Sequence, residues 1–228
     1  MMIYATSIIK KVASETDRAI LFHSASGKDS IALLDLMHPY FKEIVCVFMY
    51  TVKDMEHIGR YIGWATRKYD KARFVQIPHY SVYTYIKVGF LGCEKNPKQR
   101  KYNLEQLTDE VRKRTGITWA FYGFKQSDSL NRRLMLRGYE DEAINRKTEK
   151  CYPLSRYKNP DILRYIEDNN LMRPESYGGE HQSAGCDISD IHYLLYLRAN
   201  FPNDLTRLFA AYPMAERLLF EHDKKTEK

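Results

Sequence analysis

Short apolar runs alternate with helix-like segments along the first two thirds of the chain. Four buried strands are predicted at residues 18–23, 43–49, 73–77 and 118–122, and helices at 28–37, 54–68 and 104–114. Strands that alternate with helices are typical of βαβ units, in which the strands pair mostly in parallel. We therefore predict an α/β fold with an open, mainly parallel, twisted sheet and helices on both faces.

Helical signals replace the strand pattern after about residue 150. Asn159 followed by Pro160 is typical of a helix start, with Asn159 as the N-cap and Pro160 in the first helical position. Asp187 or Ser189 could cap a second helix, and the residues after Pro202 predict another. The C-terminal part is therefore expected to be helical.

The pattern also suggests where the chain divides. Residues 176–185 are rich in Gly, Ser and polar residues and are predicted to form a loop. The charged end, residues 222–228, is expected to fray. We expect an α/β domain over residues 1–170 and a helical C-terminal extension over residues 171–228 that packs on it.

The charge balance favours an anionic ligand without identifying it. The sequence has 36 Lys and Arg against 29 Asp and Glu, a net charge of +7. Nucleotides, tRNA, DNA and a solubilising surface all remain open. The chain has no apolar stretch of the roughly 20 residues that a membrane span needs. Lys10, Lys11, Glu15 and Asp17 interrupt the region that a signal peptide keeps apolar, so we expect a cytoplasmic protein.

The cysteines and histidines give no metal-binding pattern. The four cysteines, Cys46, Cys93, Cys151 and Cys186, form no C-x-x-C pair, and no two histidines have metal-ligand spacing. We therefore predict neither a zinc site nor an iron–sulfur cluster, and no protein ligands to a resident metal. In a reducing compartment the cysteines are expected to be free thiols.

The segment from Ser24 to Ser30 carries the clearest chemical signal. It follows the first predicted strand and opens the first helix, where unpaired N–H groups and the helix dipole bind phosphate. Gly27 lets the backbone approach an anion, Lys28 adds positive charge, and Asp29 can hold a hydroxyl, an amide or Mg²⁺-bound water. The spacing is neither a Walker A loop nor a Rossmann fingerprint, and a capped turn with an incidental lysine is the alternative. The candidates here are Ser24, Ser26, Gly27, Lys28, Asp29 and Ser30.

A second candidate segment follows the fourth predicted strand. Gly123 and Lys125 lie just past the carboxyl end of that strand, and such ends line the ligand crevice of open α/β sheets. If the first and fourth strands are neighbours, Lys28 and Lys125 share one crevice. Arg132 and Arg133 are further candidates for phosphate contacts. We expect one arginine at the site and leave open whether the other lies on a solvated helix face.

Three segments, in order, resemble one known superfamily. Ser24–Ser30 resembles the PP-loop of the adenine nucleotide alpha hydrolases, although Ala25-Ser26 replaces the usual Ser-Gly pair. Residues 122–133 are similar to the G-x-R-x-x-E-S-x-x-R segment of the phosphoadenosine phosphosulfate (PAPS) reductase group, with Lys125 and Asp128 in the Arg and Glu positions. Residues 152–166 resemble the same group's N-P-L-x-x-W-x-x-x-D-V-W-x-Y-I segment, with tyrosine in the first tryptophan position. The chain thus resembles the PAPS reductase-like branch of the PP-loop superfamily.

The resemblance implies a nucleotide-binding domain over residues 1–170 and cleavage of ATP·Mg²⁺ between the alpha and beta phosphates. An acceptor would become adenylated and pyrophosphate would leave. The implied catalytic residues are Lys28, Asp29, Lys125 and Arg132. The implied nucleotide-binding residues are Ser24, Ser26, Gly27, Lys28, Asp29, Ser30, Gly123 and Arg133.

Departures from the family pattern keep other functions open. The E-C-G-L-H motif of the reductases is missing, and the intact Ser-Gly-Lys-Asp-Ser loop favours ATP over PAPS. A reductase that uses Cys186 or Cys93 is one alternative, and a nucleic-acid-modifying or nucleic-acid-binding protein is another. We expect a nucleotide substrate, an acceptor that the sequence does not identify and no membrane partner. A nucleic acid partner and a homodimer stay open.

Overall fold

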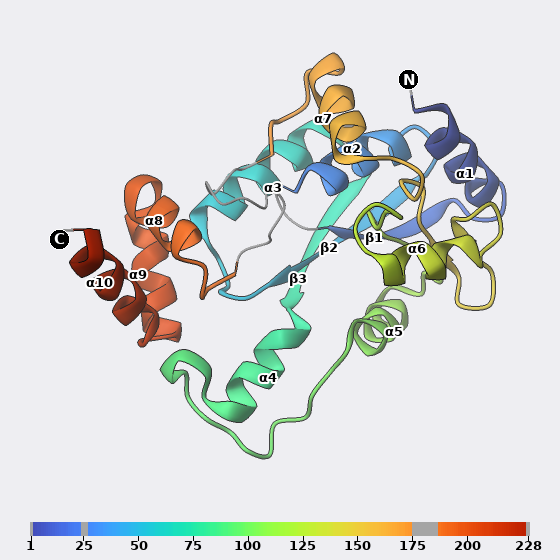
Figure 1. The fold of residues 1–228 in the computed structure, drawn as a ribbon. Helices are drawn as coiled ribbons and strands as arrows, with labels where there is room; N and C mark the ends of the chain where they lie inside the picture. The colour runs from blue at the N-terminus through green and yellow to red at the C-terminus, as the bar shows by residue number, and fades with distance from the viewer. Residues whose placement is uncertain (1, 24–26, 175–186, 227–228) are drawn as a thin grey trace. The chain divides into compact units, whose positions relative to one another are not determined.

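The fold is built on a six-stranded sheet with the order β3-β2-β1-β4-β6-β5. Figure 1 labels the first three of these strands, β3, β2 and β1. A computed structural model describes residues 2–23, 27–174 and 187–226 of the chain. The strands are β1 (Arg18–His23), β2 (Glu43–Tyr50), β3 (Ala72–Pro78), β4 (Ala120–Phe121), β5 (Ile144–Asn145) and β6 (Lys150–Cys151). The predicted, mainly parallel α/β sheet is confirmed.

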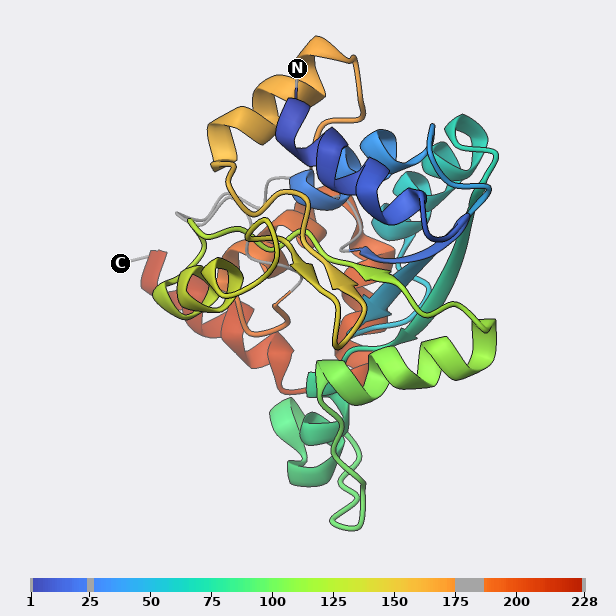
Figure 2. The same ribbon diagram turned by 90° about the vertical axis from the view of Figure 1, so that its right-hand side faces the viewer.

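Helices make up most of the remaining described structure. They are α1 (Ile3–Ala13), α2 (Lys28–Met37), α3 (Glu56–Lys68), α4 (Tyr80–Val88), α5 (Leu104–Thr115), α6 (Leu130–Arg137), α7 (Asn159–Asp168), α8 (Ile191–Asn200), α9 (Pro202–Ala211) and α10 (Ala215–Thr226), with a short 3₁₀ turn, η1, at Phe90–Gly92. Helix α2 packs against both α1 and α7 (Figures 1 and 2). Helix α2, which carries the candidate phosphate-binding residues, is therefore packed between α1 and α7.

Strand β1 lies where the order in which strands are added to the sheet reverses. It pairs in parallel with β2 from Arg18↔Glu43 to His23↔Phe48, and in parallel with β4 at Ile20↔Ala120. The chain first builds β2 and β3 on one side of β1 and then crosses to build β4 and β6 on the other. In open α/β sheets the ligand crevice lies at such a switch point, outside the carboxyl ends of the strands. The segments after β1 and β4 therefore meet where a ligand is expected.

Continuous apolar runs explain the central strands. Residues 19–23 of β1 and 44–48 of β2 are buried without interruption. An unbroken apolar strand is the signature of a parallel sheet that is covered on both faces. Such strands resist bending, so the residues at their carboxyl ends are held on a rigid edge.

The described contacts group the chain into two compact units, each assembled from separate segments. The first unit comprises Met1–Phe48, Tyr61–Gln76 and Thr108–Glu175, and the second comprises Met49–Arg60, Ile77–Leu107 and Ser176–Lys228. The second unit takes in residues 49–60 and 77–107 as well as the C-terminal part. The expected division of the chain near residue 170 stays a prediction.

A buried aspartate joins two segments of the second unit. The Asp204 carboxylate, on α9, accepts hydrogen bonds from the backbone N–H groups of Glu56 (2.6 Å) and His57 (3.0 Å) and from His57 Nδ1 (2.8 Å). These N–H groups belong to the first turn of α3, which has no acceptors of its own for them. Burial alone would raise the pKa of Asp204, but these donors outweigh it and hold the pKa below its ordinary value. Asp204 thus caps α3 from a distant part of the chain.

Replacing Asp204 with alanine will lower the free energy of unfolding by about 3 kcal/mol, because buried donors lose their acceptor. Urea unfolding measures this change. Asp223→Ala, which removes an exposed partner of Arg198, is the control and should lower the free energy of unfolding far less than Asp204→Ala does. Equal losses in the two variants would contradict a capping role for Asp204.

One predicted helix start is wrong by a residue. Helix α7 begins at Asn159 rather than after it, and Lys158 is the N-cap. The Lys158 N–H donates to the carboxylate of Asp161 at 2.8 Å, which closes the first turn one residue earlier. Pro160 therefore occupies the second helical position, where its missing N–H also costs nothing.

Two expectations near the C-terminus are also corrected. The N-cap of α8 is Asp190, which accepts the N–H of His192 at 2.9 Å, whereas Asp187 accepts from Ser189 in the preceding turn. Helix α10 continues to Thr226 through most of the segment expected to fray. The loop predicted at residues 176–185 lies outside the described residues.

Candidate functional site

Helix α2 begins at Lys28, in the part of the chain that follows β1. Gly27 is its N-cap, and the Gly27 carbonyl accepts the N–H groups of Ser30 and Ile31, both at 3.1 Å. The φ of Gly27 is −77°, which any residue can adopt. A glycine is therefore not needed here for its dihedral angles, and the predicted close approach of an anion to the backbone at Gly27 stays a prediction. Ser24 and Ser26 lie outside the described residues.

Lys28 is a buried cation in the first turn of α2. Its side chain is only 4% exposed, and its Nζ lies 3.3 Å from the Asp29 carboxylate. Ser30, in the same turn, is also buried. The first N–H groups of a helix have no acceptor within that helix and carry the positive end of its dipole. A buried lysine at this position adds a full charge to a place that already favours anions.

Lys125 connects the segment after β4 to α2. Its side chain is 2% exposed, and its Nζ lies 2.8 Å from Asp29 Oδ1 and 3.1 Å from Asp128 Oδ1. Its backbone N–H donates to Asp128 Oδ2 at 2.9 Å. Two carboxylates from separate segments therefore surround one ammonium group. This geometry favours a positioning role for Lys125, because its charge is already engaged.

Arg132 extends the same network toward solvent. Its Nη1 donates to Asp128 Oδ2 at 2.7 Å, and its guanidinium stands 4.0 Å from the centre of the Phe124 ring. Burial alone would raise the pKa of Asp128, but Lys125 and Arg132 outweigh it and hold the pKa below its ordinary value. The Arg132 side chain is 40% exposed, so it can reach a ligand while one of its donors is held.

These side chains form one charged cluster that spans two segments. We name it the lysine–aspartate cluster; its members are Lys28, Asp29, Lys125, Asp128 and Arg132. It contains three cations and two carboxylates, which leaves one net positive charge (3 − 2). A partly buried cluster with a positive charge in excess is stabilised by a bound anion. The arrangement can therefore hold a phosphate group at the helix start.

Gly123 allows the two segments to meet. A Cβ atom placed on Gly123 would lie 2.9 Å from the Cβ of Asp29, closer than real Cβ contacts occur. Only a residue without a side chain lets the strand β4 segment approach α2 this closely. Gly123 was predicted as a nucleotide contact, and that role stays a prediction beside its close approach to Asp29.

Replacing Gly123 with alanine will lower the free energy of unfolding by about 1–3 kcal/mol, because a methyl group is forced into a filled space. Gly59→Ala is the matched control: a Cβ at Gly59 meets nothing within 4 Å, and alanine favours the helix by about 0.5–1 kcal/mol. Chemical denaturation should therefore move the two variants in opposite directions. A stabilised Gly123→Ala would contradict the close approach.

The structure brings most predicted site residues together. Gly27, Lys28, Asp29 and Ser30 open α2, and Lys125 and Arg132 join them through carboxylates. Arg133 is exposed on α6, and its role at the site stays a prediction.

Phe124 and Asp128 were not predicted as site residues, although both contact Arg132. Asp128 lies three residues after Lys125 and four before Arg132, and this spacing was a usable signal.

Comparison with known proteins adds the family. The model of the phosphoadenosine phosphosulfate reductase domain matches residues 19–190, which include both segments of the lysine–aspartate cluster. The chain belongs to this family. The resemblance inferred from the three sequence segments is thereby confirmed.

This PAPS reductase-domain chain was also compared with solved structures and with curated proteins. Among solved structures it is similar to "U34-tRNA thiolase NcsA from Methanococcus maripaludis with its [4Fe-4S] cluster", with 13% sequence identity and a TM-score of 0.49. The similarity covers 94% of this chain and 77% of the other. A search of curated proteins found no match.

The cysteines of this PAPS reductase-domain chain offer no accessible low-pKa thiol among those that the structure describes. Burial raises the pKa of Cys46 and of Cys151. Burial also raises the pKa of Cys93, whose Sγ donates to the Tyr85 carbonyl at 3.3 Å. Cys186 lies outside the described residues.

The described ranges hold neither a metal-binding cluster nor a membrane-spanning helix. Residues 2–23, 27–174 and 187–226 contain no group of three or more His, Cys, Asp or Glu side chains arranged to hold a metal ion. No helix within those ranges is both long enough and apolar enough to cross a membrane.

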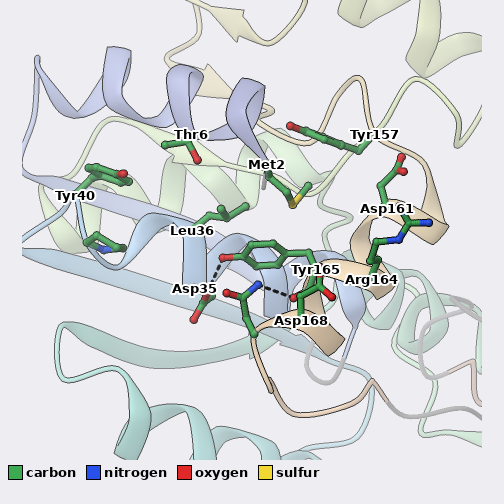
Figure 3. Close-up of a pocket in the computed structure, with 12 residues that line it drawn as sticks. Met2, Thr6, Asp35, Leu36, Tyr40, Tyr157, Asp161, Arg164, Tyr165 and Asp168 are labelled. Carbon is green, nitrogen blue, oxygen red and sulfur yellow. Dashed lines mark hydrogen bonds between the residues drawn. The ribbon is translucent and has the colours of Figure 1, made fainter.

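A pocket of about 600 Å³ lies beside α2 in the same unit of this PAPS reductase-domain chain (Figure 3). Its lining comes mainly from α1, α2 and α7 and includes no member of the lysine–aspartate cluster. Asp35 accepts hydrogen bonds from the hydroxyls of Tyr69 (2.9 Å) and Tyr165 (2.6 Å). Burial raises the pKa of Tyr165, and the Asp35 carboxylate adds to that effect. The bond from Tyr165 ties α7 to α2, and the bond from Tyr69 ties the residue after α3 to α2. Both help to fix the helix that carries Lys28.

Proposed function

We propose that this protein binds ATP at the start of α2 and transfers its adenylate group to an acceptor, with release of pyrophosphate. The observation that carries the proposal is the positive charge in excess in the lysine–aspartate cluster, next to the N-terminus of α2 at the sheet's switch point. Membership of the PAPS reductase domain family supports an adenine nucleotide as the ligand. The intact Gly27-Lys28-Asp29-Ser30 sequence supports a beta phosphate on that nucleotide.

The reaction transfers an adenylyl group without a change of oxidation state. An acceptor atom attacks the alpha phosphorus, the bond from that phosphorus to the bridging oxygen breaks, and pyrophosphate leaves with the electron pair. Lys28 and the first N–H groups of α2 neutralise charge that develops on the leaving group. Lys125 fixes Asp29 and Asp128, and Arg132 contacts phosphate or acceptor through its remaining donors.

The donor set fits a magnesium ion that enters with the nucleotide. Mg²⁺ is usually held by one or two carboxylates together with substrate phosphates, rather than by a cage of protein ligands. Asp29, with Ser30 beside it, offers oxygen ligands at the helix start. Bound there, Mg²⁺ would add charge neutralisation at the phosphates. Lys28 and Lys125 already engage the Asp29 carboxylate, so the protein's own cations carry part of that task.

Calorimetric titration with ATP and with AMP, each with Mg²⁺, tests the binding step without knowledge of the acceptor. If the cluster grips the phosphates beyond the alpha position, ATP will bind at least about tenfold more tightly than AMP, a difference of about 1.4 kcal/mol. Product analysis then tests the cleaved bond, because the proposal requires pyrophosphate rather than phosphate, with the adenylate group on the acceptor or, where water is the acceptor, released as AMP. Equal binding of ATP and AMP would overturn it.

The family match favours a second candidate, the reductive release of sulfite from PAPS. That reaction needs a thiolate to take the sulfo group and a dithiol to supply two electrons. Cys93 is a poor nucleophile because burial raises its pKa. Sulfite release from PAPS with a dithiol reductant, lost in Cys186→Ser or Cys93→Ser, would favour this candidate over ATP cleavage.

A further inference from the structure

An exposed basic segment lies between α4 and α5 in the second unit. Residues 87–101 contain five basic residues and one acidic residue, Glu94. The segment continues from η1 and appears in Figure 2 as a narrow loop beyond α4. Four of its cations have exposed side chains; they are Lys95, Lys98, Arg100 and Lys101.

Hydrogen bonds hold this basic segment in a defined conformation. The Asn96 N–H donates to the Ile86 carbonyl at 2.8 Å, and the Gln99 N–H donates to the Asn96 carbonyl at 3.0 Å. Gly89 has a φ of 74°, which favours glycine, and a Cβ there would lie 3.2 Å from the Cβ of Lys95. The cations are thus presented from a folded loop rather than from a free tail.

The exposed cations of this segment have no ion-pair partner among the described residues. Many other exposed cations of the protein are ion-paired, as Lys11 and Arg146 are with Glu140. Among the residues that the structure describes, no carboxylate lies within ion-pair distance of any of the four exposed cations. The Arg100 guanidinium stands 5.0 Å from the centre of the Tyr102 ring. Tyr102 in turn packs on Tyr83 at 4.6 Å between ring centres.

We propose that residues 95–102 form a binding surface for the sugar–phosphate backbone of a nucleic acid. Four cations within seven residues match closely spaced phosphates, and the exposed Arg100, whose guanidinium lies over Tyr102, offers a planar group on which a base can stack. Residues 94–101 contain no aliphatic or aromatic side chain beyond proline, so they offer nothing to insert into a lipid interface. Binding at residues 95–102 does not require that ATP binds at the lysine–aspartate cluster.

Salt-dependent binding to fluorescent 20-nucleotide probes, as single-stranded and as duplex DNA, tests this surface in the full chain. Four phosphate contacts predict a slope of log K against log salt of about −3 for the single strand and about −4 for the duplex. Lys95→Gln/Lys98→Gln/Lys101→Gln should reduce the magnitude of the slope by about 2–3 and weaken binding at least tenfold at 100 mM salt. The probe with the stronger dependence on these lysines identifies the strand form.

A matched variant separates this surface from a general effect of net charge. Lys42→Gln/Lys53→Gln/Lys113→Gln also removes three exposed positive charges, but each of these lysines has an acidic partner. It should retain both slope and affinity, with circular dichroism confirming that both variants are folded. Equal loss in the two variants would overturn the proposal. Equally tight, lysine-dependent binding to anionic phospholipid vesicles would overturn it in favour of a membrane surface.

Discussion

Replacing Lys28 with methionine will reduce pyrophosphate release from ATP by at least about 100-fold and leave the protein folded. Methionine fills a similar volume at this buried position but supplies no charge to the leaving pyrophosphate. Loss of one well-placed electrostatic contact in a partly closed site typically costs 10²–10³ in rate, or roughly 3–4 kcal/mol. Release of labelled pyrophosphate under saturating ATP measures the loss.

Lys42→Met provides the comparison for Lys28→Met. Lys42 is an exposed lysine paired with Asp17, so its removal lowers the net charge equally without touching the lysine–aspartate cluster. Its rate should stay within a factor of two of the unmodified protein. Undiminished release in Lys28→Met would reject the assignment of the triphosphate to the start of α2.

Replacing Lys125 with methionine will lower the free energy of unfolding at neutral pH by about 3 kcal/mol. The substitution removes the Lys125 ammonium group, which lies between the carboxylates of Asp29 and Asp128. Breaking a buried ion pair from one side typically costs 3–5 kcal/mol, and the lower end applies because both carboxylates keep partial access to water. Lys113→Met, at an exposed lysine on α5, should change stability by no more than about 0.5 kcal/mol.

The pH dependence of the Lys125 effect has a defined sign. The folded pKa of Asp128 lies below its ordinary value of 3.8, so the stability it contributes is fully present above that value. That stability is lost as the pH falls through the lowered folded pKa. The gap between the unmodified protein and Lys125→Met should therefore be full at neutral pH and narrow in acid. A gap that stays constant down to acid unfolding would show that Lys125 contributes by packing rather than by charge.

The elements with a clear pattern were predicted well, and those set by distant contacts were not. The helix predicted at residues 28–37 has the observed bounds of α2, because a glycine start and a dense apolar stripe mark it locally. Helix α4 was not predicted, since Tyr80–Val88 is rich in aromatic and β-branched residues. Its bounds are set by His79, which caps it, and by Gly89 in the left-handed conformation. The two-residue strands β5 and β6 are too short to carry a pattern of their own.

The candidate site likewise has residues that the sequence predicted and contacts that it did not. Lys28 and Lys125 were predicted from their places after two strands, and parallel pairing of β1 with β4 confirms that those strands are neighbours. That two carboxylates engage Lys125 was not predictable, because Asp29 approaches it across a gap of about 100 residues in the chain. The packing of Gly123 against Asp29 likewise depends on how closely two elements meet.

The cap that Asp204 places on α3 limits how the gene can be shortened. A stop codon after residue 175 would leave the N–H groups of Glu56 and His57 in the protein but remove the carboxylate that accepts them. Helix α3 continues from those residues into the segment that packs beside β1, where the Tyr61 hydroxyl bonds to His23 at 2.8 Å. Truncation at the C-terminus would therefore weaken a helix that begins about 120 residues upstream, so a stable fragment carrying the lysine–aspartate cluster is not expected from trimming that end alone.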